Sequence, residues 1–179
     1  WPTLKPCIEE FWKNGHQTLF YAEGKWKHHL EAFRELPDRS IVFHCDQDDI
    51  FDVHRRLHDK FAISGGIPNV LLRYGKGDEV REFCVWVIRE VAVDGGYIMD
   101  AGASMHNVTS SENLRVITQV ARDLGVQYIL EGGVRRSGAQ IRVTAQLIDP
   151  TTGAHLWVEK YDRNIEDIFE VQDEIANMI

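Results

Sequence analysis

Reactive side chains follow each of four short apolar runs in the first hundred residues. They are Tyr21, Glu23, His44, Cys45, Asp46, Ser64 and Asp100, and His106 follows in the loop after the last run. If the runs are parallel strands, their carboxyl ends meet at one edge of a sheet, where (β/α) barrels carry their chemistry. Phenol, imidazole and carboxylate groups at that edge could hold a small molecule and exchange protons with it.

His44, Cys45 and Asp46 together offer imidazole, thiolate and carboxylate groups, which could bind a metal such as zinc or supply an acid and a base. Adjacent strand residues point to opposite faces of a sheet, however, and the usual zinc ligands are separated by intervening residues. The favoured interpretation is that His44 or Cys45 packs in the sheet while Asp46 and Asp48 cap the next helix. No metal site is therefore predicted.

Asp100 ends the last apolar run, where a carboxylate could act as a general base or hold a substrate nitrogen, or could cap a turn. The Ser64-Gly65-Gly66 segment could present backbone N–H groups to an anion, or could be a plain turn that ends a strand. The predicted substrate-binding residues are Ser64, Gly65, Gly66 and Glu23.

His54 and His58 stand four residues apart, the spacing at which two histidines on one helix face bind a metal. Arg55 follows His54 at the position where a metallopeptidase has its glutamate. The alternative, a solvated helix face, is the favoured interpretation.

The elements that must position these groups alternate along the first 110 residues. Strands are predicted at Thr18–Tyr21, Ser40–Phe43, Phe61–Ser64 and Tyr97–Met99, and helices at Pro2–Asn14, Trp26–Leu36, Asp48–Lys60 and Asp78–Val93. Strands separated by helices pair in parallel through right-handed crossovers. Because a closed (β/α) barrel needs about 250 residues, four units predict a partial barrel, a TIM-type half-barrel with four parallel strands.

The last third of the chain changes pattern. A helix at Ser111–Leu124 is followed by strands at Val126–Val134, Gln140–Ile148 and Ala154–Tyr161, and by a last helix that Asn164 caps. Residues 140–148 alternate between apolar and polar side chains, which is typical of a half-buried antiparallel strand. The predicted fold is therefore an α/β half-barrel over residues 1–113 and a small α+β domain with an antiparallel three-stranded sheet over residues 114–179.

Composition limits the classes of partner. The chain has 20 Lys and Arg against 28 Asp and Glu, a net charge of −8, which disfavours binding to nucleic acid. No run approaches the roughly 18 apolar residues of a membrane span. Three cysteines are too few and too odd for a disulfide framework, which indicates reduced thiols and a cytoplasmic protein.

The strings FAISGGIPNVLLRYGKGDEVREFC and GGYIMDAGASMHNVTSSENLRV resemble the C-terminal half of the uroporphyrinogen decarboxylase superfamily, which includes porphyrinogen decarboxylases and corrinoid-linked methyltransferases. The resemblance implies a TIM barrel with its site at the strand ends and a tetrapyrrole-type substrate. It also implies a lyase reaction that removes a carboxylate from a pyrrole acetate side chain without a cofactor. The catalytic residues that it implies are Tyr21, Asp100 and His106.

Two departures from that superfamily bear on activity. Ala103 follows Gly102 where the decarboxylases have a histidine that contacts the substrate, and the nearby His106 is a shifted substitute. The methyltransferases bind zinc through a His-x-Cys pair, and the corresponding FYAEGKW segment has no cysteine. The resemblance therefore implies an incomplete enzyme with no metal or cofactor.

The residues from about 116 onward resemble the TolB-like N-terminal module of bacterial adenylate-cyclase and TPR-repeat signalling proteins, through the strings LEGGVRRSG, RVTAQLID, TGAHLW and YDR. That resemblance implies a fusion and, as the alternative function, a non-catalytic protein-interaction module. Half a barrel leaves unpaired strand edges. We therefore expect a homo-oligomer or a partner protein to cover the open sheet edge.

Overall fold

The computed structural model describes residues 1–105, 109–126, 129–149, 152 and 154–164. The chain divides into two compact units, Trp1–Val120 and Ala121–Ile179, and each unit contains its own sheet. The division falls within helix α6 (Ser111–Asp123), the helix in which the sequence also places the boundary, at residues 113/114.

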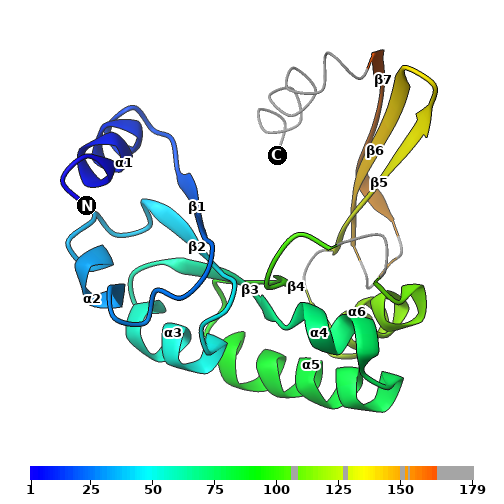
Figure 1. Ribbon diagram of the computed structural model, residues 1–179, viewed down its shortest axis with the longest axis horizontal. Helices are drawn as coiled ribbons and strands as arrows, with labels where there is room; N and C mark the ends of the chain where they lie inside the picture. The colour runs from blue at the N-terminus through cyan, green and yellow to red at the C-terminus, as the bar shows by residue number, and fades with distance from the viewer. Residues whose placement is uncertain (106–108, 127–128, 150–151, 153, 165–179) are drawn as a thin grey trace. The chain divides into compact units, whose positions relative to one another are not determined.

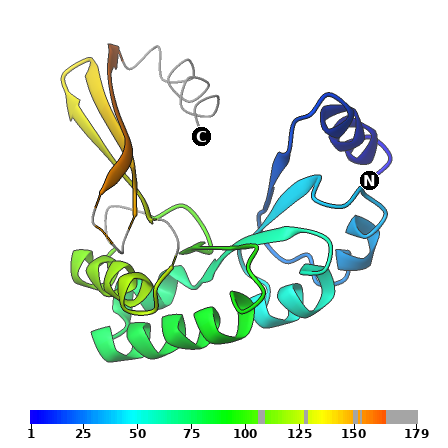
Figure 2. The same ribbon diagram turned by 180° about the vertical axis from the view of Figure 1, so that it is seen from behind.

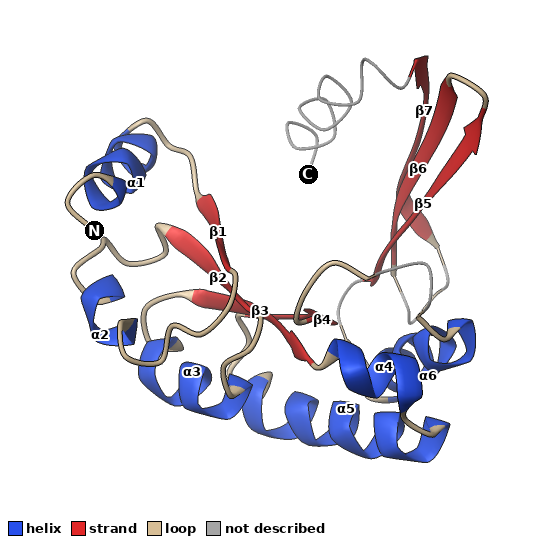
Figure 3. Cartoon of the chain, viewed as in Figure 1, coloured by secondary structure: helices blue, strands red, loops and turns tan. Residues whose placement is uncertain are grey.

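The first unit alternates helices and strands as predicted. Its elements before α6 are α1 (Leu4–Lys13), β1 (Thr18–Ala22), α2 (Leu30–Phe33), β2 (Ile41–Cys45), α3 (Ile50–Leu57), β3 (Ala62–Ile67), α4 (Asn69–Tyr74), α5 (Gly77–Val91) and β4 (Tyr97–Ala101). The four strands form one parallel sheet in the order β1-β2-β3-β4. Helices α2, α3 and α5 lie along one side of it (Figure 1 and Figure 3). The α/β half-barrel arrangement is therefore confirmed.

Alternate residues divide this sheet into a covered face and an open face. Phe20, Phe43 and Ile63 pair across the sheet in one row and are buried in the core that the helices cover. The neighbouring rows point the other way, and there Leu19 and Ile98 are 63% and 56% exposed. The view from behind shows the same one-sided layer of helices (Figure 2).

Helix α5 supports the covered face. Val80, Cys84, Val87 and Val91 recur at helical spacing and are buried, so they form the apolar stripe of an amphipathic helix. Phe83, which belongs to the same stripe by spacing, is only partly buried. The support therefore comes mainly from the smaller side chains of the helix.

The prediction that Gly65 and Gly66 end the third strand is wrong, because β3 continues through both of them to Ile67. Their φ angles are +79° and +82°, in the left-handed region that glycine adopts readily. A Cβ atom on Gly65 would lie 2.6 Å from the carbonyl oxygen of Cys45, and one on Gly66 would lie 2.6 Å from Cβ of Ile50. The two glycines thus allow β2 and α3 to approach β3 closely.

Two helical details differ from expectation. The helix expected over residues 26–36 is confined to the four residues of α2, with turns on either side. Helix α4 begins directly after Pro68, where no helix is predicted.

Among the described residues, no helix combines the length and the apolar character that crossing a membrane requires.

The second unit contains the predicted antiparallel sheet. Its strands are β5 (Ile129–Ser137), β6 (Gln140–Ile148) and β7 (His155–Asn164), paired in sequence order. Gly138, with a φ of +61°, lies in the turn between β5 and β6. The expected last helix lies outside the described residues, and Asn164, its expected cap, ends β7.

Candidate functional site

Three neighbouring strands bring Tyr21, His44 and Ser64 into one row on the open face. Tyr21 of β1 pairs with His44 of β2, and His44 pairs with Ser64 of β3. The rings of Tyr21 and His44 stack, with centroids 4.3 Å apart and planes at 17°. Tyr21 is 41% exposed, whereas His44 and Ser64 are buried. Tyr21 therefore covers the imidazole and faces solvent itself.

Both ring nitrogens of His44 have hydrogen-bond partners. Nδ1 lies 2.9 Å from Oγ of Ser64, and Nε2 lies 3.1 Å from the carbonyl oxygen of Gly102. A carbonyl oxygen can only accept, so Nε2 carries the proton of the neutral ring. Nδ1 then accepts from the Ser64 hydroxyl. We call Tyr21, His44, Ser64 and the Gly102 carbonyl group the strand-end cluster.

The loop after β4 is held so that Gly102 can reach His44. The Gly102 N–H donates to the carbonyl oxygen of Ile67 over 2.8 Å. A Cβ atom on Gly102 would lie 2.6 Å from the carbonyl oxygen of Asp46, so only glycine fits this close approach without displacement. The side-chain amide of Asn69 binds the same loop through the carbonyl oxygens of Ala103 and Ser104, at 3.2 and 3.1 Å.

The sequence places His44 among the reactive groups at the strand ends, but it predicts neither the contacts of His44 in this cluster nor the supporting role of Asn69. His44 is considered there for packing, metal binding or acid–base chemistry, and Asn69 is not singled out. The two elements that meet at His44 are 58 residues apart in the chain, so no local pattern links them. The one available signal is the glycine that follows the last strand, since a glycine often marks a close approach of backbone.

The carboxylates that follow β2 hold the preceding loop instead of capping α3. Asp46 accepts from the Gly24 N–H over 2.7 Å, and Asp48 accepts from the N–H groups of Trp26 and Lys27. Asp49 is the residue that caps α3. The capping prediction for Asp46 and Asp48 is therefore wrong, because their carboxylates are taken up by N–H groups of the segment after β1.

Cys45 is a poor metal ligand in this setting. Burial and the nearby Asp48 carboxylate raise the pKa of the Cys45 thiol to about 12, so the thiolate that binds metals does not form near neutral pH. Its Sγ donates to the Asp48 carbonyl oxygen over 3.3 Å. In the part of the chain that the structure describes, no group of three or more His, Cys, Asp and Glu side chains could hold a metal ion.

The other predicted site residues lie at or beyond the edge of the strand-end cluster. Asp100 of β4 is exposed and pairs in register with Gly66, and its Oδ1 accepts from the N–H of Ala101 over 2.7 Å. Glu23 follows β1 and is exposed. Gly65 and Gly66 are buried within β3. His106 lies outside the described residues.

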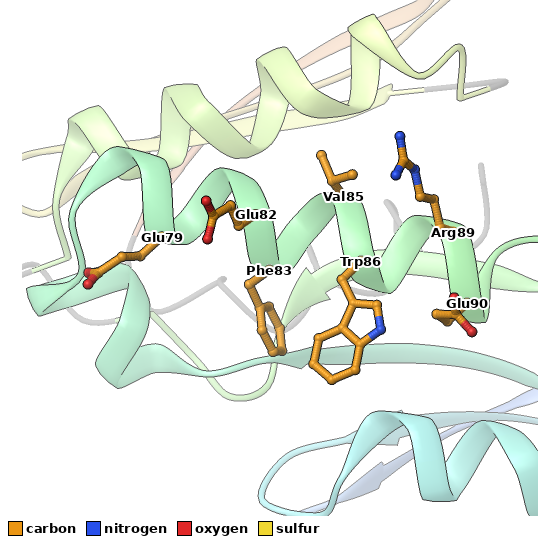
Figure 4. Close-up of a pocket in the computed structure, with 7 residues that line it drawn as sticks. All are labelled: Glu79, Glu82, Phe83, Val85, Trp86, Arg89 and Glu90. Carbon is orange, nitrogen blue, oxygen red and sulfur yellow. The ribbon is translucent and has the colours of Figure 1, made fainter.

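A shallow hollow of about 620 Å³ lies over α5, away from the strand ends. Figure 4 shows Phe83 and Trp86 on one side of the helix and Val85 and Arg89 on the other. The Trp86 ring stacks on Phe51, with centroids 4.0 Å apart. Because its lining side chains diverge around one helix, this hollow does not enclose a site.

Two comparisons with known proteins give matches. A family model described as "Uroporphyrinogen decarboxylase (URO-D)" matches residues 1–124. A protein named "Putative adenylate cyclase 3", from Rhizobium meliloti (strain 1021), is 60% identical over 63 residues, which are 35% of this chain and 11% of that protein. The chain thus spans only a small part of the length of that relative. No solved structure matches the chain significantly.

Proposed function

The chain belongs to the uroporphyrinogen decarboxylase family, and from that premise we propose that the open face of its parallel sheet binds a tetrapyrrole-type small molecule. The binding groups are the side chains of the strand-end cluster and the exposed side chains beside it on the same face. The single observation that carries this proposal is the strand-end cluster, in which an exposed phenol, an imidazole and a hydroxyl converge from three strands.

The open face has the mixed character that a carboxylated tetrapyrrole requires. Leu19 and Ile98 are exposed apolar side chains that can contact pyrrole rings, and the Tyr21 ring can stack on one. Asp100 is an exposed carboxylate on the same face, able to accept hydrogen bonds from pyrrole N–H groups. A simple carboxylic acid has neither aromatic rings nor pyrrole N–H groups to make such contacts. This combination of side chains therefore supports binding of the macrocycle.

Turnover is the finer and more demanding part of the proposal. Decarboxylation of an acetate side chain breaks a C–C bond, releases CO2 and requires a proton on the carbon left behind. Ala103 stands where the family pattern has a histidine, while His44 is engaged at both ring nitrogens. We therefore propose that the chain binds porphyrinogen but turns it over slowly or not at all on its own.

The experiment is a fluorescence titration of the full chain with uroporphyrin, the oxidised and stable form of the macrocycle. Tyr21→Ala removes the stacking surface and should weaken binding by about fivefold, since such aromatic contacts contribute about 1 kcal/mol. Tyr74→Ala is the control, because Tyr74 of α4 is also a tyrosine with an exposed side chain, 69% exposed against 41% for Tyr21. Equal affinity of the Tyr21 and Tyr74 variants would overturn the proposal.

Turnover is tested separately with porphyrinogen. Product formation by the full chain that is lost in Asp100→Asn would support a decarboxylase. If the wild-type chain forms no product but still binds uroporphyrin, the result would support the binding function alone.

A second candidate function is a protein-interaction module formed by the second unit. It is supported by the resemblance of the residues from about 116 onward to a signalling-protein module and by the exposed apolar side chains Leu156 and Val158 of β7. The 63-residue match of the chain to a protein named as a putative adenylate cyclase is compatible with it. Such a module would associate with a second copy or with a partner protein. Light scattering tests this: the full chain should form an oligomer that Leu156→Glu dissociates, whereas a monomer at all concentrations would exclude self-association.

A further inference from the structure

Two histidines of α3 have no role in the strand-end cluster. His54 lies in the last turn of α3, and His58 is its C-cap residue, so the two side chains share one helix face. Their rings stack with centroids 4.5 Å apart and planes at 28°. Nδ1 of His58 lies 2.9 Å from the carbonyl oxygen of His54. Nδ1 therefore donates, and the lone pair of the neutral His58 ring is on Nε2.

The unusual atom is Nε2 of His54. It is buried and has no hydrogen-bond partner, which is a costly state for a polar atom. Burial lowers the pKa of His54, the neighbouring His58 lowers it further, and Asp94 partly opposes both effects. The net result favours the neutral imidazole, which is the form that binds metals. A bound ion would give this nitrogen the partner that it lacks.

The charges around the pair do not oppose a cation. Arg55 and Arg56 flank the helix turn, and both pair with the Asp52 carboxylate. Arg56 also lies 3.8 Å from Glu31. The negative charge of Asp94 raises the pKa of His54, so Asp94 favours a positive charge at this position. A divalent ion would thus meet arginines that already have carboxylate partners.

We propose that Nε2 of His54 and Nε2 of His58 form a two-histidine site for a divalent transition metal ion of the nickel, copper and zinc class. Imidazole suits these ions, and histidines at i and i+4 are a known helical ligand pair. His58 is exposed, so its ring can turn from the stacked position and open His54 Nε2 to the ion. Water completes the coordination, because no third protein ligand is grouped with the pair among the described residues.

The test uses the full chain and Ni²⁺ alone, which avoids the redox chemistry of copper with the cysteines. Calorimetry should show one site whose affinity falls on the order of tenfold or more in His54→Gln and in His58→Gln, since each removes one of two protein ligands. His28→Gln is the matched control. His28 and His29 are exposed neighbours in sequence and do not share a helix face, so this variant should retain the wild-type affinity.

Thermal unfolding gives a second readout. Ni²⁺ that binds the paired histidines of the folded helix raises the melting temperature by mass action, and the rise should disappear in the double variant His54→Gln/His58→Gln. His58→Gln keeps the test interpretable if His54→Gln unfolds, because His58 is exposed. A nickel-dependent rise that persists in the double variant, or no rise in the wild type, would overturn the proposal.

Discussion

His44 is the most constrained side chain of the candidate site, and Ser64 makes one of its two hydrogen bonds. Ser64→Ala removes the hydroxyl that faces Nδ1 and leaves a buried acceptor without a donor. We expect the free energy of unfolding to fall by about 1–3 kcal/mol. Urea unfolding measures this, with Ser104→Ala as the exposed control. Equal stabilities of the two variants would contradict the assigned hydrogen bond.

Gly65 is required for conformation and for space, and the two requirements can be separated. Gly65 and Gly95 have nearly the same φ, +79° and +78°, but a Cβ atom on Gly95 would meet nothing within 4 Å. Gly95→Ala should therefore cost only the left-handed strain of about 1–2 kcal/mol. Gly65→Ala should cost about 1–3 kcal/mol more, because its Cβ atom meets the Cys45 carbonyl oxygen. Denaturant unfolding that shows no difference would refute the close approach.

Asp59 gives a prediction for acid pH. The Arg34 guanidinium bonds both carboxylate oxygens at 2.8 Å and lowers the pKa of Asp59 to about 2. A lowered pKa of a carboxyl group stabilises the fold above its ordinary pKa, and this contribution is lost as the pH falls towards 2. Because the pair is on the surface, its contribution is under about 1 kcal/mol. Asp59→Asn should differ from wild type at pH 5 and converge with it near pH 2; parallel stability curves across that range would contradict the prediction.

At the residue scale, the sequence predicts which strands end in reactive groups but not which groups meet. Tyr21 and Ser64 are assigned to the site from their strand-end positions. His44 is not among the predicted site residues, because its partner Gly102 becomes a neighbour only when the sheet forms. The roles assigned to Tyr21, Asp100 and His106 stay predictions.

The elements follow from periodicity wherever the apolar pattern is long enough to be unambiguous. The four strands, α5 and the antiparallel sheet of the second unit are predicted correctly. The short elements are not, because α2 and α4 contain too few residues to show a helical period. The sequence does not predict that β3 extends through Gly65 and Gly66, because glycine pairs usually mark turns. In the structure these two positions are glycines within a strand because β2 and α3 approach them too closely for a side chain.

The packing of α2 against the sheet depends on Phe33. Its ring is fully buried and makes edge contacts with Phe20 and Phe43. Phe33→Ala should lower the free energy of unfolding by about 3–5 kcal/mol, as expected for a large side chain removed from a core. Phe11→Ala is the control, since Phe11 is 54% exposed on α1 and should change stability by less than about 0.5 kcal/mol. Calorimetric or urea unfolding that ranks the two variants alike would show that the core is misassigned.

At the scale of the whole molecule, one chain contains two sheets of different kinds. Helices α2, α3 and α5 of the first unit lie on one face of its parallel sheet (Figure 1), and exposed side chains lie on the other face. A face of this kind is the natural location for a ligand in a barrel family, because the strand ends collect polar groups there. The acidic net charge of −8 disfavours anions in general. Binding of a carboxylated macrocycle must therefore depend on ring contacts and pyrrole N–H groups more than on long-range attraction.

The most direct test of the central claim is amide chemical-shift mapping of the ¹⁵N-labelled full chain during titration with uroporphyrin. The largest changes are expected at Tyr21, His44 and Ser64, which pair in register across three adjacent strands. Changes confined to α5 around Phe83 and Trp86, or no saturable changes at all, would contradict a ligand site on the open face.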